Sequence, residues 1–153
     1  MFKRKKLIVV SGIVLIVAAI FFASIGSLYM VPIIMYHSVT PEAKVEDRIQ
    51  ISVNSFNRQM CFLKSHHYNV VPLAMVGEMI RDKKKIPFKT VALTFDDGYQ
   101  DNYVYAYPIL KKFGLPATVF IIVNEVGRPQ GDRLSWDEIK KMQASNLDRK
   151  SVV

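Results

Sequence analysis

The chain has 153 residues, and its 21 lysines and arginines outnumber its 13 aspartates and glutamates to give a formal net charge of +8. This length suffices for one small domain but falls short of a complete (β/α)-barrel, which takes ~250 residues. The positive charge suits anionic wall polymers or lipid headgroups, whereas no interleaving of basic and aromatic residues indicates nucleic acid as a partner. The single cysteine excludes an internal disulfide.

The first thirty residues form a separate unit that predicts a membrane anchor. Four basic residues at positions 3–6 precede an uncharged run from Leu7 to Tyr36, and its stretch 7–29 is long enough to span a bilayer core. The basic cluster predicts a cytoplasmic N-terminus with everything after the helix outside, as in a single-pass membrane protein in contact with lipid. Small residues at 24–26 leave a cleaved signal peptide and a secreted protein as the alternative.

Beyond the anchor, segments with strand and helix patterns alternate along the chain. Strands are expected at 31–35, 69–72, 90–95 and 117–123, and helices at 55–65, 73–82, 102–113 and from 135 onward. Pro108 is expected to break or kink the helix that contains it, and Gly114 to cap the end of that helix. Alternation of this kind predicts an α/β fold with a parallel sheet.

Two of the expected helices carry apolar residues at helical spacing, which predicts one buried face on each. The residues expected to be buried are Phe56, Met60, Cys61 and Leu63 on the first, and Trp136, Ile139 and Met142 on the last. The last helix also opens with Ser135 and Glu138 at the spacing of a capping box, which predicts its first turn.

Two neighbouring carboxylates, Asp96 and Asp97, stand where the expected strand 90–95 ends. Because adjacent strand residues point to opposite sides, these two are not expected to work as one carboxylate pair. One could bind a metal ion while the other takes a proton from water held on that metal. The alternative is a simple turn, in which the aspartates bond to their own backbone and Gly98 supplies a positive φ.

The segment from Thr94 to Gly98, with Tyr99 and the stretch from Tyr107 to Gly114, resembles the first motif of the NodB-homology polysaccharide deacetylases, carbohydrate esterase family four. Three further segments resemble the same family, at 35–39, 115–120 and 135–139. The first of these is similar to a segment of the subgroup that acts on poly-N-acetylglucosamine. The resemblance extends over roughly positions 31–147, and it implies the N-terminal portion of the family's (β/α)-barrel, here preceded by one transmembrane helix.

The resemblance also implies roles for three residues. Asp96 matches the family's general base, Asp97 matches a metal ligand, and His37 matches the histidine that serves the poly-N-acetylglucosamine subgroup as general acid. The implied reaction removes N-acetyl groups from N-acetylglucosamine-containing polymers of the cell wall or of an exported polysaccharide, with a divalent metal, zinc foremost, as cofactor. Position alone leaves His37 open as an ordinary histidine at a strand end.

The chain departs from the family at the other two metal ligands, a histidine pair on the strand after the last expected helix. Its three histidines are His37, His66 and His67, and the last two are neighbours at a helix end, where side chains diverge by about 100°. They are expected to complement the helix dipole instead. The tail 148–153 does not resemble the expected strand and is interpreted as aberrant, as from a truncated reading frame; a shorter complete variant is the alternative.

Three hypotheses for the function follow. The first is a polysaccharide N-deacetylase present as a truncated N-terminal portion, which we expect to be inactive alone because one carboxylate does not hold a catalytic zinc ion. The second is a non-catalytic, membrane-anchored protein that binds glycan. The third is an inactive remnant of an interrupted gene.

Overall fold

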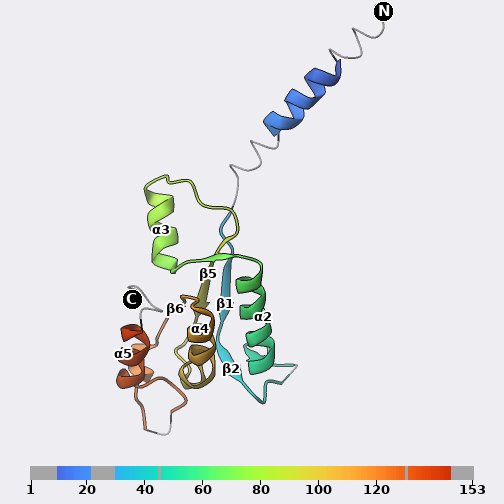
Figure 1. Ribbon diagram of the computed structural model, residues 1–153. Helices are drawn as coiled ribbons and strands as arrows, with labels where there is room; N and C mark the ends of the chain where they lie inside the picture. The colour runs from blue at the N-terminus through green and yellow to red at the C-terminus, as the bar shows by residue number, and fades with distance from the viewer. Residues whose placement is uncertain (1–9, 22–29, 45, 130, 146–153) are drawn as a thin grey trace, which may run out of the picture. The chain divides into compact units, whose positions relative to one another are not determined.

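The computed structural model describes residues 10–21, 30–44, 46–129 and 131–145, and the chain divides into two compact units, Met1–Met30 and Val31–Val153 (Figure 1). In the first unit, residues 10–21 are helical. The predicted basic stub and the predicted aberrant tail lie outside the described residues. None of the helices in the described ranges has both the length and the apolar character that crossing a membrane requires.

A parallel sheet built around β5 (Thr90–Phe95) forms the centre of the second unit. Along one edge of β5 runs β1 (Ile33–Tyr36), and along the other edge β4 (Asn69–Val70) pairs with the beginning of β5 and β6 (Thr118–Val119) with its end. The strands β2 (Ser38–Thr40) and β3 (Gln50–Ser52) form a second parallel pair, which the sequence did not predict. The predicted α/β fold with a parallel sheet is confirmed.

Four helices accompany these strands, and side chains cap the first turns of two of them, α2 and α5. They are α2 (Val53–Ser65), α3 (Leu73–Arg81), α4 (Tyr107–Phe113) and α5 (Trp136–Ala144). The side chain of Ser52 caps α2 by accepting a hydrogen bond from the Ser55 N–H at 3.2 Å. At the start of α5, Ser135 and Glu138 form the predicted capping box.

Of the two effects expected of Pro108, a break or a kink, the break does not occur. A π-helical segment, η1 (Asn102–Ala106), leads directly into α4, and Pro108 lies in the first turn of α4. In the π-helical turn the Tyr107 N–H bonds to the Asn102 carbonyl, five residues back. Pro108 has no N–H to donate, and the chain stays helical through it. Gly114 then ends α4 with a left-handed φ of 64°, as predicted.

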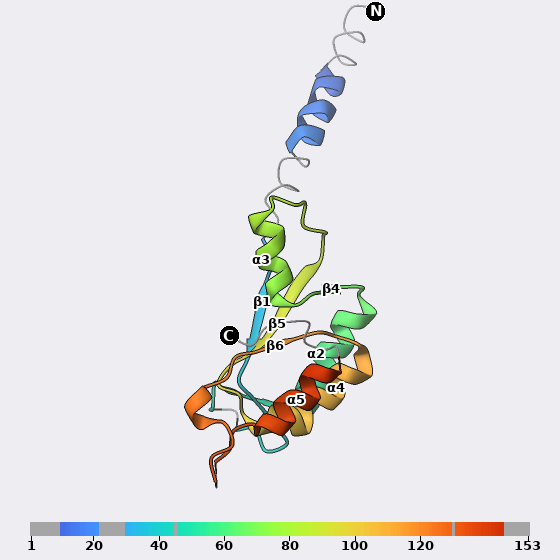
Figure 2. The same cartoon turned by 90° about the vertical axis from the view of Figure 1, so that its left-hand side faces the viewer.

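The main core lies between one face of the sheet and the helices α2 and α4 (Figure 2). Three aromatic rings mark its centre: Tyr36 from β1, Phe56 from α2 and Phe95 from β5 have ring centroids 5.1 to 5.8 Å apart. On the opposite face of β5, Ala92 packs against Val76 of α3. β5 is therefore buried on both faces, as a central parallel strand requires.

Two predictions of burial were wrong. Cys61 is exposed although Phe56, Met60 and Leu63 are buried, because one residue along α2 turns the side chain by about 100° away from the core. The described part of α5 has no buried residue, and Trp136 is 47% exposed.

The strand expected at 117–123 is also shorter than predicted, since β6 ends at Val119. The Phe120 N–H still bonds to the Phe95 carbonyl at 2.7 Å, but β5 ends at Phe95 and offers later residues no partner. A 3₁₀ turn, η2 (Val123–Glu125), follows instead.

Candidate active site

His37 and Asp96 lie next to each other at the carboxyl edge of the sheet, which is the edge at which β1, β5 and β6 end. β1 and β5 are parallel, and Tyr36 lies opposite Phe95 at their carboxyl ends. The next residues, His37 and Asp96, therefore follow the two strands at the same position in the register. The Asp96 N–H donates to the Tyr36 carbonyl at 2.9 Å, which extends the pairing by one step. Both His37 and Asp96 are half-buried.

The carboxylate of Asp96 has an oxygen available for chemistry. Its Oδ1 atom is buried and has no hydrogen-bond partner in the described part of the chain. A buried acceptor without a partner costs free energy, on the order of 1–3 kcal/mol, and such atoms call for an explanation. An oxygen kept free to accept a proton from a reactant would provide one.

The backbone of Asp97 does not continue the extended conformation of β5. It takes a left-handed backbone with φ of 66°, and Gly98 follows with φ of 61°. A non-glycine residue in this region costs roughly 1–2 kcal/mol, and such strain is typical of functional sites. At Gly98 a Cβ atom would come within 3.0 Å of Ile121 Cγ2. The turn interpretation and the site interpretation are thus compatible, because a strained backbone at Asp97 fits both.

A segment of the long connection after β6 supports this turn from outside. The Leu134 N–H donates to the Gly98 carbonyl at 2.9 Å and the Gln100 N–H donates to the Asp132 carbonyl at 2.8 Å. Between them, the Arg133 guanidinium lies 3.8 Å from the centre of the Tyr99 ring. No local sequence pattern connects Tyr99 with Arg133.

A hydrogen bond between Ser38 and Asp101, which sequence reasoning did not predict, joins the segments that follow β1 and β5. The Ser38 hydroxyl, directly after His37, donates to Asp101 Oδ2 at 2.5 Å. Burial raises the pKa of the Asp101 carboxyl, although the hydrogen bonds from Ser38 and the Val39 backbone lower it. Asn102 is 1% exposed, and neither its side-chain oxygen nor its side-chain nitrogen has a hydrogen-bond partner among the described residues. Polar groups therefore converge beside the candidate pair.

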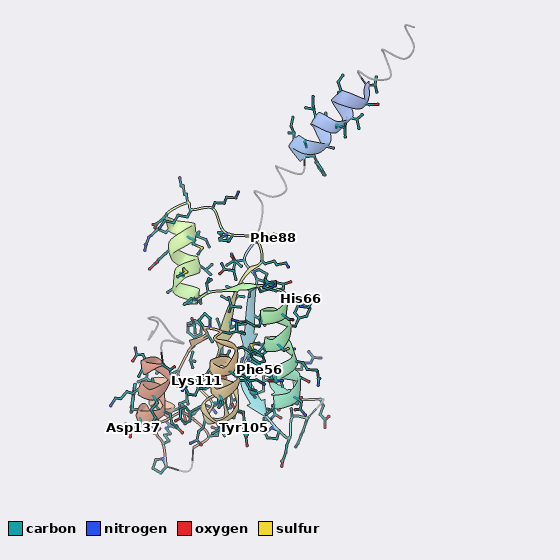
Figure 3. The ribbon with its side chains drawn as sticks, in the orientation of Figure 1. Phe56, His66, Phe88, Tyr105, Lys111 and Asp137 are labelled. Carbon is teal, nitrogen blue, oxygen red and sulfur yellow. The ribbon has the colours of Figure 1, made fainter. Side chains whose placement is uncertain are left out.

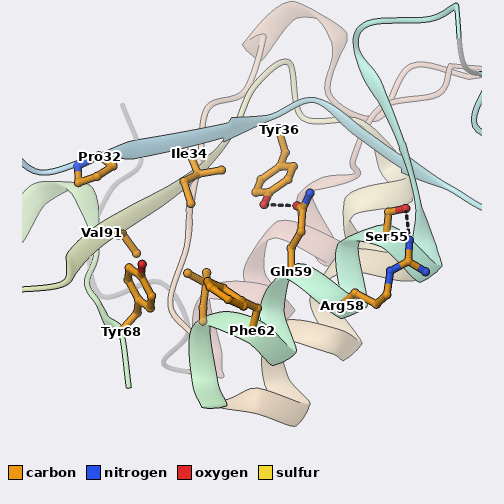
Figure 4. Close-up of a pocket in the computed structure, with 10 residues that line it drawn as sticks. Pro32, Ile34, Tyr36, Ser55, Arg58, Gln59, Phe62, Tyr68 and Val91 are labelled. Carbon is orange, nitrogen blue, oxygen red and sulfur yellow. Dashed lines mark hydrogen bonds between the residues drawn. The ribbon is translucent and has the colours of Figure 1, made fainter. Parts of the chain in front are cut away.

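An open pocket of about 630 Å³ adjoins these residues. All but two of the residues that line it are polar or aromatic and suited to a hydrophilic ligand; they are Ser38, Thr40, Glu42, Lys44, Gln50, Tyr99, Gln100, Asp101, Tyr105 and Asp132. A second pocket of about 610 Å³ lies on the flank of the sheet between β1 and α2 (Figure 4). There the Tyr36 hydroxyl donates to Gln59 Oε1 at 2.7 Å, and burial raises the pKa of Tyr36 to about 12. The lining of this flank pocket contains no carboxylate or histidine, so the chemistry belongs at the carboxyl edge.

A family model described as polysaccharide deacetylase matches residues 83–150, which include Asp96 and Asp97. Over these residues the chain matches the polysaccharide deacetylase family. It is 38% identical over 102 residues to a poly-beta-1,6-N-acetyl-D-glucosamine N-deacetylase of Staphylococcus aureus, which covers 63% of this chain and 34% of that protein. With the Escherichia coli K12 protein of the same name, it is 31% identical over 127 residues, which covers 74% of this chain and 19% of that protein.

Solved deacetylases have the same fold as the second unit. IcaB from Ammonifex degensii matches with a TM-score of 0.69 and 33% identity, covering 76% of this chain and 49% of that one. The Streptococcus pyogenes deacetylase PplD, solved in complex with acetate, matches with a TM-score of 0.67 and 29% identity, covering 75% and 52%. The chain spans less than half the length of the relatives that it matches in sequence.

Polysaccharide deacetylases of this type are generally metal-dependent, but the described residues alone do not fit a metal. No group of three His, Cys, Asp or Glu side chains able to hold an ion occurs among them, whereas catalytic zinc usually has three protein ligands. His66 and His67 lie at the end of α2, where His66 Nδ1 is 3.0 Å from the Phe62 carbonyl oxygen. The structure therefore brings His37 and Asp96 to neighbouring strand ends, and within its described ranges Asp97 belongs to no group of three candidate metal ligands.

Proposed function

We propose that this chain carries the acid and base of a polysaccharide N-deacetylase that acts on an N-acetylglucosamine-containing polymer, in the partial (β/α)-barrel of that family. The observation that carries the proposal is the placement of His37 and Asp96 at the ends of paired parallel strands, with Asp96 Oδ1 buried and without a hydrogen-bond partner among the residues that the structure describes. A general acid and a general base must reach one bond from two directions, and two adjacent strand ends offer that arrangement.

The names of the relatives support the substrate class. The Staphylococcus aureus and Escherichia coli relatives are poly-beta-1,6-N-acetyl-D-glucosamine N-deacetylases, and the Streptococcus pyogenes structure holds acetate, the acid that cleavage of an acetamide releases. We carry this substrate to the present chain as a proposal, since it spans only part of each relative.

In the proposed reaction, the residues of this chain move two protons. Asp96 takes a proton from the water whose oxygen attacks the acetyl carbonyl carbon. Protonated His37 donates a proton to the sugar nitrogen as the carbon–nitrogen bond breaks, which releases acetate and a free amine. Asp97 would serve as one ligand of a divalent metal, zinc foremost, and the other ligands would come from outside the described residues.

The test joins the full chain to the second half of the Staphylococcus aureus relative and measures acetate release from N-acetylglucosamine oligomers. We expect Asp96→Asn to lower the rate by 10²- to 10⁴-fold, the usual contribution of a general base, and the chain without the added half to release no acetate. The matched control is Asp137→Asn, which removes an exposed carboxylate on α5 and should leave the rate unchanged. Unchanged turnover in the Asp96 variant contradicts the assignment.

One observation favours a second candidate, a non-catalytic glycan-binding protein. The pocket of about 630 Å³ beside the site presents hydroxyl, amide and aromatic groups suited to a sugar. Calorimetry separates the two functions: binding of N-acetylglucosamine oligomers to the full chain, without acetate release from the completed protein, would favour the binding role.

The proposed location is the outer face of the cell membrane. We propose that residues 1–30 form an uncleaved single-pass anchor, with membrane lipid as its partner and the deacetylase part outside the cytoplasm. The basic residues at 3–6 and the uncharged run from Leu7 onward support this orientation. Secretion after signal cleavage is the alternative.

A further inference from the structure

The end of the second unit away from the candidate site carries a concentration of positive charge. This amino edge is formed by the last turns of α2 and α3 and by the start of β5. Between Glu78 and Lys89 the chain has five basic residues against two carboxylates, and the basic ones are Arg81, Lys83, Lys84, Lys85 and Lys89. The last turn of α2 adds Lys64.

Contacts within the amino edge join the start of β5 to the end of α2, and Asp82 is paired with basic side chains. Lys89 Nζ donates to the His66 carbonyl at 2.9 Å, which joins the approach to β5 to the end of α2. Asp82 bridges both Arg81, at 3.2 Å, and Lys84, at 3.0 Å. Within the described part of the chain, no carboxylate forms an ion pair with Lys83 or Lys85, and both are exposed. The edge is left with a net positive surface.

The backbone of the amino edge adopts costly conformations at basic positions. His67, Lys83 and Lys89 have φ angles of 56°, 52° and 61°, the left-handed region in which glycine or asparagine is cheaper. Cations that follow a helix gain from the helix dipole, but this effect fades within the last turn. It accounts for Lys83 beside α3, and Lys89 is accounted for by its bond to the His66 carbonyl and its position 5.6 Å from the centre of the Tyr68 ring. The charge at Lys85 is left unexplained.

Two large apolar side chains are exposed beside these lysines. Phe88 is 76% exposed and Ile80 is 63% exposed, and Figure 3 shows Phe88 and His66 at the same end of the unit. A water-soluble polyanion would be recognised by charge alone. Aromatic and aliphatic side chains mixed with lysines are instead typical of residues at the interface between lipid and water.

The polypeptide also enters the second unit at this edge. Val31, its first residue, packs against Val71 and Val76, and the Pro32 carbonyl accepts the Ala92 N–H at 3.0 Å. We propose that the amino edge rests on the anionic headgroups of the membrane that holds the anchor, so that the carboxyl edge with His37 and Asp96 faces away from the lipid toward the polymer. This inference rests on the membrane anchor of the proposed function.

The test uses the full chain in lipid nanodiscs with one environment-sensitive fluorophore on Phe88→Cys, in a Cys61→Ser background. We expect its emission to shift to the blue in phosphatidylglycerol nanodiscs relative to phosphatidylcholine ones. The shift should vanish at about 1 M salt, where charges are screened over about 3 Å. Each lysine at an anionic surface strengthens contact by roughly fivefold, so Lys83→Gln, Lys84→Gln and Lys85→Gln together should lower the equilibrium constant for contact by about a hundredfold.

The matched control removes three charges at the other end of the unit, through Lys44→Gln, Arg48→Gln and Arg128→Gln, and should keep the shift. Equal emission in the two lipids, or an equal shift from a label on Lys44→Cys, overturns the inference while leaving the anchor intact. A chain that does not co-elute with nanodiscs overturns both. A response to inorganic polyphosphate but not to phosphatidylglycerol would assign the edge to a soluble polyanion and also overturns the proposal.

Discussion

Asp101 is a carboxyl held partly out of water at the rim of the candidate site. Burial raises its pKa above the ordinary 3.8, and the neighbouring Asp132 acts in the same direction. The folded protein therefore binds more protons at this group than the unfolded chain does in the interval between the two pKa values. Stability contributed by this group is present below the unfolded pKa and is lost as the pH rises through the folded one.

Asp101→Asn should remove this pH-dependent loss, because an amide keeps the shape of the group and cannot ionise. We expect the unfolding free energy of the variant to fall less steeply than that of the parent chain between about pH 4 and pH 7. Urea unfolding of the full chain in detergent micelles at several pH values measures both slopes. Asp137→Asn, an exposed carboxyl on α5, is the control and should reproduce the parent slope. Parallel curves for the Asp101 variant would refute the argument.

The same residues show what the sequence can reveal about a site. The family resemblance assigned roles to His37 and Asp96, and the strand patterns before them place both residues at the common edge where parallel strands end. Ser38 and Asp101 could not, since their hydrogen bond joins positions 63 apart and neither lies in a periodic pattern.

At the level of elements, the observed β5 has the bounds that were predicted, because its apolar residues alternate without interruption and it is buried on both faces. β2 and β3 were missed because strands of three residues are too short for a period of two to stand out. The overlong prediction at 117–123 has a different origin. Composition marks a segment as suited to a strand, but the length of the strand depends on how far its partner extends.

The turn that follows β5 is expected to depend on glycine at position 98. Gly98→Ala forces a Cβ atom into a left-handed backbone and to within 3.0 Å of Ile121 Cγ2, so we expect a loss of about 1–3 kcal/mol in the free energy of unfolding. The matched control is Gly77→Ala in α3, where a Cβ atom meets nothing within 4 Å and the helix should gain about 0.5–1 kcal/mol. Chemical denaturation of the full chain compares the two variants. A Gly98 variant as stable as the parent would show that the turn relaxes freely.

At the scale of the whole molecule, the charge distribution of the first thirty residues predicts which side of the membrane receives the rest. A reporter enzyme fused after Val153 should be active only outside the cytoplasm, because the basic residues at 3–6 hold the N-terminus inside. Replacing these four residues by glutamine should move a sizeable fraction of the reporter to the cytoplasm. Cytoplasmic activity of the unaltered fusion would rule out the anchor orientation.

The order of the strands in the sheet has a consequence for how the chain is made. β1 and β4 both pair with β5, which is synthesised after them. Neither early strand has a partner until β5 has emerged, so the central sheet cannot form before then, although β2 and β3 can already pair with each other. Chains grow at about 5–20 residues per second, so β1 and β4 remain unpaired for several seconds. Under the proposed export, this delay would leave them extended while they pass through a translocation channel.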